Sequence, residues 1–179
     1  MIQYLETDRL YMRPFKSTDA ASLFAMDSNP NVHTYLWQQP VQHIEECYKI
    51  ISALEAQYER NHIGRFATFL KETDEFIGWT GIKYIDDHVE NGNTNFFDYG
   101  YRLMESHWGK GYATEASQKW LAHGFQEMQI PEIHAYTHSQ NGASNHILQK
   151  IGMQFKETYP DESGILWNWY LLVNPHLKP

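Results

Sequence analysis

The sequence has little cysteine and no long apolar run, and each shortage excludes a class of protein. Its 179 residues contain one cysteine, Cys47, so no internal disulfide can form, and no metal-ligand spacing surrounds this residue. No apolar stretch approaches the roughly 20 residues of a membrane-spanning helix, and the opening MIQYLETDRL lacks the basic and apolar segments of a signal peptide. We therefore predict a cytoplasmic protein with no membrane partner, in which Cys47 is a buried structural thiol.

Positive charge is also scarce. The chain has 14 lysines and arginines against 22 acidic residues, a formal net charge of -8, and its basic residues form no stripe. An extended phosphate backbone would be repelled, so we predict no nucleic-acid partner. A small anionic ligand is still compatible with this charge, because the amino terminus of a helix can bind phosphate without net positive charge.

The composition suits one folded domain. Apolar residues make up 42% and aromatic residues 15% of the chain, which is enough for a hydrophobic core. No internal repeat, low-complexity stretch or Pro/Gly/Ser-rich linker divides the sequence. We predict a single domain over residues 1–179.

Hydrophobic periodicity predicts a mixed α/β chain. The expected strands cover residues 8–15, 64–72, 76–86, 94–104, 132–139, 153–159 and 165–173, and the expected helices cover 17–30, 40–61, 112–128 and 142–152. One helix carries a regular apolar face and has Pro40 in its first turn; the face consists of Val41, Ile44, Tyr48, Ile51, Leu54 and Tyr58. The order predicts antiparallel hairpins first and a strand–helix–strand crossover in the middle.

The stretch WGKGYATEA turns the chain from an aromatic strand into a helix. Gly109 and Gly111 have no side chain to block a ligand and can adopt positive φ. The main-chain N–H groups from about Gly109 to Thr114 would face one concavity, where the positive end of the helix dipole also lies. This arrangement is typical of a diphosphate site, to which Thr114 can add a hydroxyl and Lys110 a charge at the rim.

Other interpretations of the turn fit less well or remain open. A P-loop is excluded, because the six-residue spacing and the Lys-Ser/Thr ending are missing. A dinucleotide-binding fingerprint would need a small residue where Thr114 stands, and its acidic residue, Glu132, begins the next strand instead of ending it. A purely structural turn stays an alternative on this stretch alone.

Several motifs in order resemble one family. DYGYRLMESHWGKGYATEA, preceded by LETDRLYMRPF and TDAASLFAMDSNPNV and followed by IHAYTHSQNGASNHILQKIGM, resembles the GNAT N-acetyltransferases, in their RimJ/RimL-like (ribosomal-protein-alanine) branch. The motifs run from Leu5 to Met153. The resemblance implies a central, mostly antiparallel sheet that is splayed at the CoA site and flanked by helices. It also implies transfer of acetyl from acetyl-CoA directly to a primary amine, with a protein N-terminus as one candidate acceptor. The spacing of possible ligands, separately, predicts no metal.

The same resemblance implies which residues contact the CoA moiety. The glycine turn would hold the pyrophosphate, the preceding strand the pantetheine arm, and the short late helix the arm near the sulfur. The implied contacts are Leu103, Met104, Trp108, Gly109, Lys110, Gly111, Tyr112, Ala113, Thr114, Asn141 and Ser144. Trp108 stands where the family often has Gln or Arg. Asn141 and Ser144 could instead cap their helix.

The catalytic groups are less clear. Ser144 matches a hydroxyl considered as the acid that protonates the leaving thiolate, whereas the tyrosine used elsewhere in the superfamily is replaced by Leu148. Some relatives have a glutamate that acts as the general base on the strand before the glycine turn. On that strand this chain has Phe97, Tyr99 and Tyr101. The remaining candidate bases, each more simply interpreted as a solvated surface group, are Asp98, His138, Glu157 and Glu162.

The acceptor side and the partners are weakly specified. Aromatic residues near the early helices and the last hairpin suit either core packing or acceptor recognition; they are Tyr35, Trp37, Trp167 and Trp169. His134 and His138 share a strand face but lack a third metal ligand in spacing, and Glu115 is expected to stabilise its helix start. Two alternatives to a protein acceptor remain at this point: a small-molecule amine acceptor (polyamine, amino acid or antibiotic) and a non-catalytic acyl-CoA sensor. A homodimer is also possible under the resemblance.

Overall fold

The computed structural model describes residues 4–36 and 38–177, and the mixed α/β fold is confirmed. The strands are β1 (Leu5–Glu6), β2 (Leu10–Arg13), β3 (Arg65–Leu70), β4 (Phe76–Ile85), β5 (Phe96–Leu103), β6 (Glu132–His138), β7 (Gln154–Pro160) and β8 (Leu166–Val173). The helices are α1 (Ala20–Asp27), α2 (Ile44–Asn61), α3 (Tyr112–Gln126) and α4 (Gly142–Lys150), with short 3-10 helices η1 (Ser17–Asp19) and η2 (Glu105–His107). No helix within the described ranges is long and apolar enough to cross a membrane.

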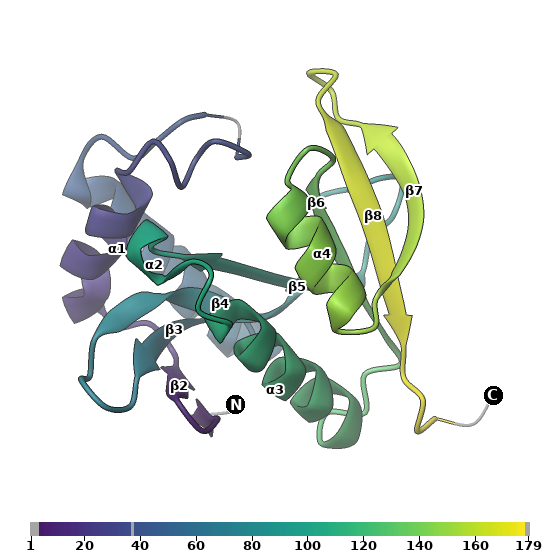
Figure 1. Cartoon of the computed structure of the whole chain (residues 1–179), viewed down its shortest axis with the longest axis horizontal. Coiled ribbons are helices and arrows are strands. Elements are labelled where there is room, and N and C mark those ends of the chain that lie inside the picture. Colours follow the sequence, from purple (N-terminus) through teal and green to yellow (C-terminus); the bar gives the residue numbers. More distant parts are fainter. Residues whose placement is uncertain (1–3, 37, 178–179) are drawn as a thin grey trace.

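The strands form one sheet in the order β1-β2-β3-β4-β5-β6-β8-β7 (Figure 1). Neighbouring strands are antiparallel except β5 and β6, which are parallel and joined through α3, as the predicted crossover requires. β4 and β5 pair from Gly78 to Ile85, whereas β5 and β6 pair, within the described residues, only where Asp98 faces His134. The two halves of the sheet therefore touch at one point and separate beyond it.

Hydrophobic layers cover both faces of the sheet. On one face Trp120 of α3 packs edge-on against Phe66 of β3, with ring centroids 5.0 Å apart. On the other face Met26 of α1 and Cys47 of α2 pack near Phe69 of β3. Cys47 is fully buried, as predicted, and burial raises the pKa of its thiol to about 11. Figure 1 shows α3 and α4 in front of the sheet, with the β7–β8 hairpin beside α4.

Several elements differ from their predicted boundaries, and the helix expected over 17–30 is the 3-10 helix η1 followed by the shorter α1. The strand expected over 8–15 is the shorter β2, which pairs with β1. Pro40 lies outside α2, which begins after His43, because the Glu46 carboxylate accepts the His43 N–H at 2.8 Å and caps the helix there. Tyr48, expected on the buried face of this helix, is 49% exposed, and Cys47 faces the core instead.

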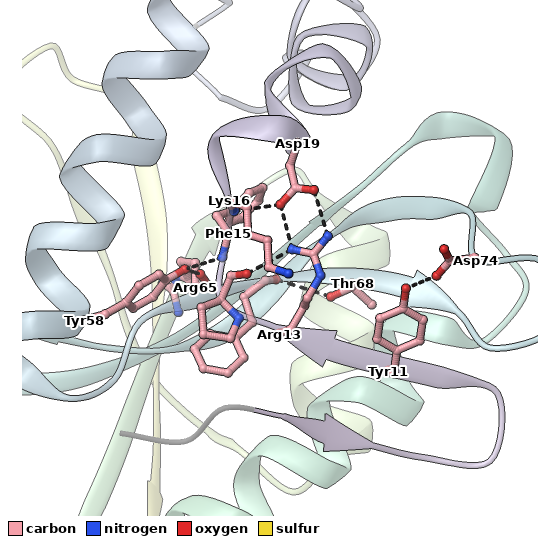
Figure 2. Close-up of polar contacts among 11 residues, drawn as sticks. Tyr11, Arg13, Phe15, Lys16, Asp19, Tyr58, Arg65, Thr68 and Asp74 are labelled. Carbon is pink, nitrogen blue, oxygen red and sulfur yellow. Dashed lines mark hydrogen bonds and ion pairs between the residues drawn. The ribbon is translucent and has the colours of Figure 1, made fainter.

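Polar contacts fix the segment after β2 to the sheet and to α2 (Figure 2). Arg13 donates to both carboxylate oxygens of Asp19, at 2.7 and 2.8 Å. The hydroxyl of Tyr58 accepts the Phe15 N–H at 3.3 Å and donates to the carbonyl of Arg65. These contacts position α1 and α2 over the first half of the sheet.

Candidate active site

The opening between β5 and β6 is a cleft of about 1350 Å³. Its walls are the second half of β5, the middle of β6 and the starts of α3 and α4, and parts of α2 and the segment before it close the other side. The facing edges of β5 and β6 carry main-chain groups that no neighbouring strand uses beyond the single contact point. An extended ligand can hydrogen-bond to such edges.

The glycine turn forms one end of this cleft. Gly109 and Gly111 have φ of 73° and 83°, the left-handed region that favours glycine. A Cβ at Gly109 would meet no atom within 4 Å, so the concavity is open there. Because α3 begins at Tyr112, the N–H groups of its first turn have no partner within the helix. The turn therefore fits the predicted diphosphate, with main-chain donors and the positive helix end on an open surface.

The amino-terminal segment holds this turn in place. Arg9 donates to the carbonyl of Lys110 at 3.1 Å and to the carboxylate of Glu115 at 2.6 Å, and its guanidinium lies 4.5 Å from the centre of the Tyr112 ring. Glu115 also accepts from the Thr7 hydroxyl. Burial alone would raise the pKa of Glu115, but these hydrogen bonds and the Arg9 charge lower it overall. Glu115 thus stabilises the helix start, as expected, through contacts that sequence reasoning did not identify.

Two hydroxyls meet midway along the cleft. The phenol oxygen of Tyr101 lies 2.9 Å from the hydroxyl oxygen of Ser144, and both residues line the cleft. Asn141 caps α4, since its side chain accepts the Ser144 N–H at 3.1 Å. Leu148 is buried and offers no proton. Tyr101 was recognised only as a strand residue, and its two-residue spacing from Tyr99 was the signal that it faces the helix side of β5.

The remaining predicted CoA contacts differ in position. All of them line the cleft except Met104, which packs near the α1–α2 core, and Lys110, whose carbonyl is bound by Arg9. Trp108 is 48% exposed and its indole N–H donates to the Leu103 carbonyl at 2.8 Å. A pantetheine contact at that carbonyl would use its second lone pair.

The candidate bases lie in different environments. Asp98 is 3% exposed and forms an ion pair with Arg65, so its expected place on the solvated surface is wrong. Asp98 alone among these candidates lines the cleft. Glu157 and Glu162 are exposed, as the surface interpretation predicted, and Glu157 accepts from an amide on the loop after β4. His138 is partly buried at the end of β6.

Aromatic rings bridge the two sides above the cleft. The Tyr35 ring, from the segment between α1 and α2, lies 5.4 Å from the His138 ring, which lies 5.8 Å from Trp167. Tyr35 and Trp167 line the cleft. Trp167 and Trp169 are both buried in one hydrophobic cluster, and Trp169 does not line the cleft. Trp37 lies outside the described residues. Among the described residues, no group of three or more His, Cys, Asp or Glu side chains is placed to hold a metal ion.

The fold and this cleft define an α/β domain that can bind an extended ligand with an anionic end. The model of the acetyltransferase (GNAT) domain matches residues 9–154, and the chain belongs to this family. It is 31% identical over 180 residues to the uncharacterized N-acetyltransferase YoaA of Bacillus subtilis, covering 98% of this chain and 99% of that protein.

Solved structures of related enzymes share the fold. The ribosomal-protein-S5-alanine acetyltransferase of Vibrio fischeri superposes with a TM-score of 0.78 at 19% identity, covering 99% of this chain and 100% of that one. The spermidine N-acetyltransferase of Vibrio cholerae, in complex with CoA and spermine, superposes with a TM-score of 0.75 at 16% identity, covering 94% and 97%. The recognised family is confirmed, and the chain is an acetyl-CoA-dependent N-acetyltransferase.

Proposed function

We propose that this enzyme acetylates a primary amine within the β5–β6 opening, with acetyl-CoA lying along β5. One observation carries the proposal: a single cleft joins the glycine turn, the unpaired edge of β5 and the hydroxyls of Tyr101 and Ser144. The N–H groups of the turn and of the first residues of α3 would bind the diphosphate. When bound, acetyl-CoA supplies the acetyl group as a thioester.

The chemistry assigns a role to Ser144. In the transfer the amine nitrogen bonds to the thioester carbon, the carbon–sulfur bond breaks, the nitrogen loses a proton and the sulfur gains one. A thiol has a pKa of about 8.5, so its thiolate leaves readily and a weak acid suffices. Ser144 donates that proton and the hydroxyl of Tyr101 at 2.9 Å replaces it. The proton that the amine nitrogen releases passes to solvent water, and a proton from water restores the Tyr101 hydroxyl. Asp98 is bound by Arg65 and is not assigned as the base.

Two classes of acceptor follow from different observations. A protein N-terminus is supported by the shared fold with the Vibrio fischeri ribosomal-protein acetyltransferase. A small amine is supported by the contact between the Tyr35 and His138 rings, which joins the segment between α1 and α2 to the end of β6 beside the cleft. A single domain over residues 1–179, a cytoplasmic location and a homodimer are further parts of this proposal.

The test is thiol release from acetyl-CoA with a panel of amines. The panel contains peptides that begin with Ala, Ser or Met, together with spermidine, free amino acids and aminoglycosides. We expect thiol release with one class, matched by mass spectrometry of the acetylated product. Acetyl-CoA that raises the melting temperature without thiol release from any amine would contradict the proposal and indicate a sensor.

A further inference from the structure

The acceptor side of the cleft has a floor made by one face of β3, β4 and β5. Cross-strand pairing places Lys83 opposite Asp98 and Gly81 opposite Gly100, so these four residues share this face. Arg65 is paired with Gly81 from the other side. Residues two apart on one strand, and residues directly opposite on neighbouring strands, point to the same face of a sheet. Lys83, two residues from Gly81, therefore lies on the same face as Arg65, one strand away.

The glycines allow Arg65 to lie flat across two strands. A Cβ at Gly100 would lie 2.8 Å from Nη2 of Arg65, so any other residue would displace the guanidinium. Arg65 donates to the carbonyl of Gly81 and, at 2.8 Å, to the carbonyl of Asp98, as well as to the Asp98 carboxylate. The result is a fixed, nearly buried guanidinium at the bottom of the cleft.

Lys83 has no direct hydrogen-bond or ion-pair partner among the described residues, although Asp98 stands opposite it and Asp98, Asp87 and Glu90 act on its charge at longer range. The arginines that line the cleft are all paired with carboxylates: Arg60 with Asp86, Arg65 with Asp98 and Arg102 with Asp27. The other lining carboxylates also have partners, since Asp87 contacts His88 and Glu105 accepts from Asn29 and Asn31. Among the described residues, Lys83 alone of the basic groups in the cleft forms no hydrogen bond or ion pair.

The charged form of Lys83 is destabilised by its surroundings. Burial, and next the charge of Arg65, lowers the pKa of Lys83, although Asp98, Asp87 and Glu90 oppose this shift. An anion beside the ammonium would offset both the loss of hydration on burial and the repulsion by Arg65. Lys83 lies three residues along β4 from Thr80, the partner of Tyr101, a distance of about 10 Å, and its side chain stands on the opposite face of the sheet from that of Tyr101. An acceptor bound at Lys83 therefore reaches the Tyr101–Ser144 pair through the opening between β5 and β6, which both residues line.

We propose that the amine acceptor carries a carboxylate, and that Lys83, supported by Arg65, binds this group on the floor of the cleft. The inference rests on the proposed function and specifies its substrate class. It is opposite to what the net charge of -8 would select, because an acidic protein steers cations toward itself. Polyamines, which have no anionic group, would leave Lys83 unpaired and bring a second cation beside it.

The experiment compares acceptors that differ only in this group. We would measure kcat/KM by thiol release for L-alanine, L-methionine, L-phenylalanine and L-glutamate, each against its α-carboxamide, with spermidine as the cationic acceptor. Ala-Glu-amide against Ala-Gln-amide tests whether a side-chain carboxylate of a peptide serves as well as a free one. We expect at least one carboxylate-bearing amine to exceed its neutral partner tenfold or more.

Substitutions at Lys83 test whether this residue recognises the carboxylate of the acceptor. Lys83→Met should raise KM for the carboxylate-bearing amine at least tenfold and leave kinetics with its neutral amide within twofold, whereas Lys83→Arg should retain most of the preference. Lys156→Met, on the exposed strand β7, is the matched control and should change neither. A binding measurement accompanies these assays: with CoA present, the N-acetylated amino acid should raise the melting temperature more than its amide in the wild type, but not in Lys83→Met.

The outcomes separate the inference from the proposed function. Thiol release that is equal for acids and amides, or greatest with spermidine, would overturn the inference and leave the acetyltransfer intact. An equal loss of kcat with acid and amide in Lys83→Met would show that Lys83 takes part in the chemistry and would also overturn it. Absence of thiol release with every amine would contradict the proposed function, and the binding measurement would then still decide the inference.

Discussion

The phenol oxygen of Tyr101 on β5 and the hydroxyl oxygen of Ser144 on α4 lie 2.9 Å apart, across the opening of the sheet. Burial raises the pKa of Tyr101, so its proton is retained at neutral pH, although the bond to Ser144 opposes the shift. The N–H of Ser144 is held by Asn141, which fixes the side chain at the start of α4. The pair is therefore a positioned source of a proton beside the expected path of the CoA sulfur.

Ser144→Ala should lower kcat by about tenfold or more and change the affinity for acetyl-CoA much less, because the hydroxyl acts on the leaving thiolate. Tyr101→Phe should have a similar effect, and the double variant should lose less than the product of the single losses, since the two hydroxyls act as one unit. Steady-state kinetics and calorimetry with acetyl-CoA measure both quantities. A wild-type kcat in Ser144→Ala would leave this residue with a structural role only.

Gly111→Val should weaken CoA binding at least tenfold, or about 1.4 kcal/mol. The residue has φ of 83°, and a Cβ there would lie 3.4 Å from Nη2 of Arg9, so a branched side chain both strains the backbone and displaces the arginine that holds the turn. Gly92→Val is the matched control, because Gly92 has φ of 71° with nothing within 4 Å of a Cβ and lies in the loop between β4 and β5. Calorimetry should show a loss of CoA affinity in Gly111→Val only. If Gly111→Val is folded and binds CoA as tightly as the wild type, the glycine turn is not part of the CoA site.

Glu115→Gln should reduce the free energy of unfolding by about 1–2 kcal/mol at pH 7, since charged hydrogen bonds to Thr7 and Arg9 are lost. The folded pKa of Glu115 is below its unfolded value. Its contribution is therefore complete above the unfolded pKa of about 4.5 and disappears as the pH falls through the lowered folded value.

Urea unfolding at several pH values between 7 and 3 measures this contribution. The gap between wild type and Glu115→Gln should narrow toward the acid end, while Glu72→Gln, in the exposed turn after β3, should match the wild type throughout. A gap that is constant with pH would show that the carboxylate charge is not what joins Arg9 to the start of α3.

The parts of the fold that depend on local pattern could be predicted from the sequence. The crossover through α3 follows from periodicity and from the glycines at 109 and 111, whose need for positive φ is a property of the residue itself. The face of α2 was misjudged at Tyr48, because neighbouring positions on a helix are separated by only 100° and the apolar stripe there is wide.

The contacts that define the site join residues that are distant in sequence. Arg65 reaches Asp98 and Arg9 reaches Glu115, and no local pattern indicates such a pairing. Asp98 was expected to be solvated because it alternates with aromatic residues on its strand, and the alternation does not reveal that the second face is also buried. The place of Lys83 opposite Asp98 likewise depends on strand pairing, which no local sequence pattern indicates.

Asp98→Asn should destabilise the protein by about 3 kcal/mol, because it leaves the guanidinium of Arg65 in a buried site without its carboxylate. Replacement of both partners, Arg65→Met with Asp98→Asn, should recover part of this loss, since a buried charge without a partner costs more than the absence of the pair. The free energy of unfolding in urea measures both effects. If Asp98 served instead as the catalytic base, Asp98→Asn would lower kcat and leave the stability within about 0.5 kcal/mol of the wild type.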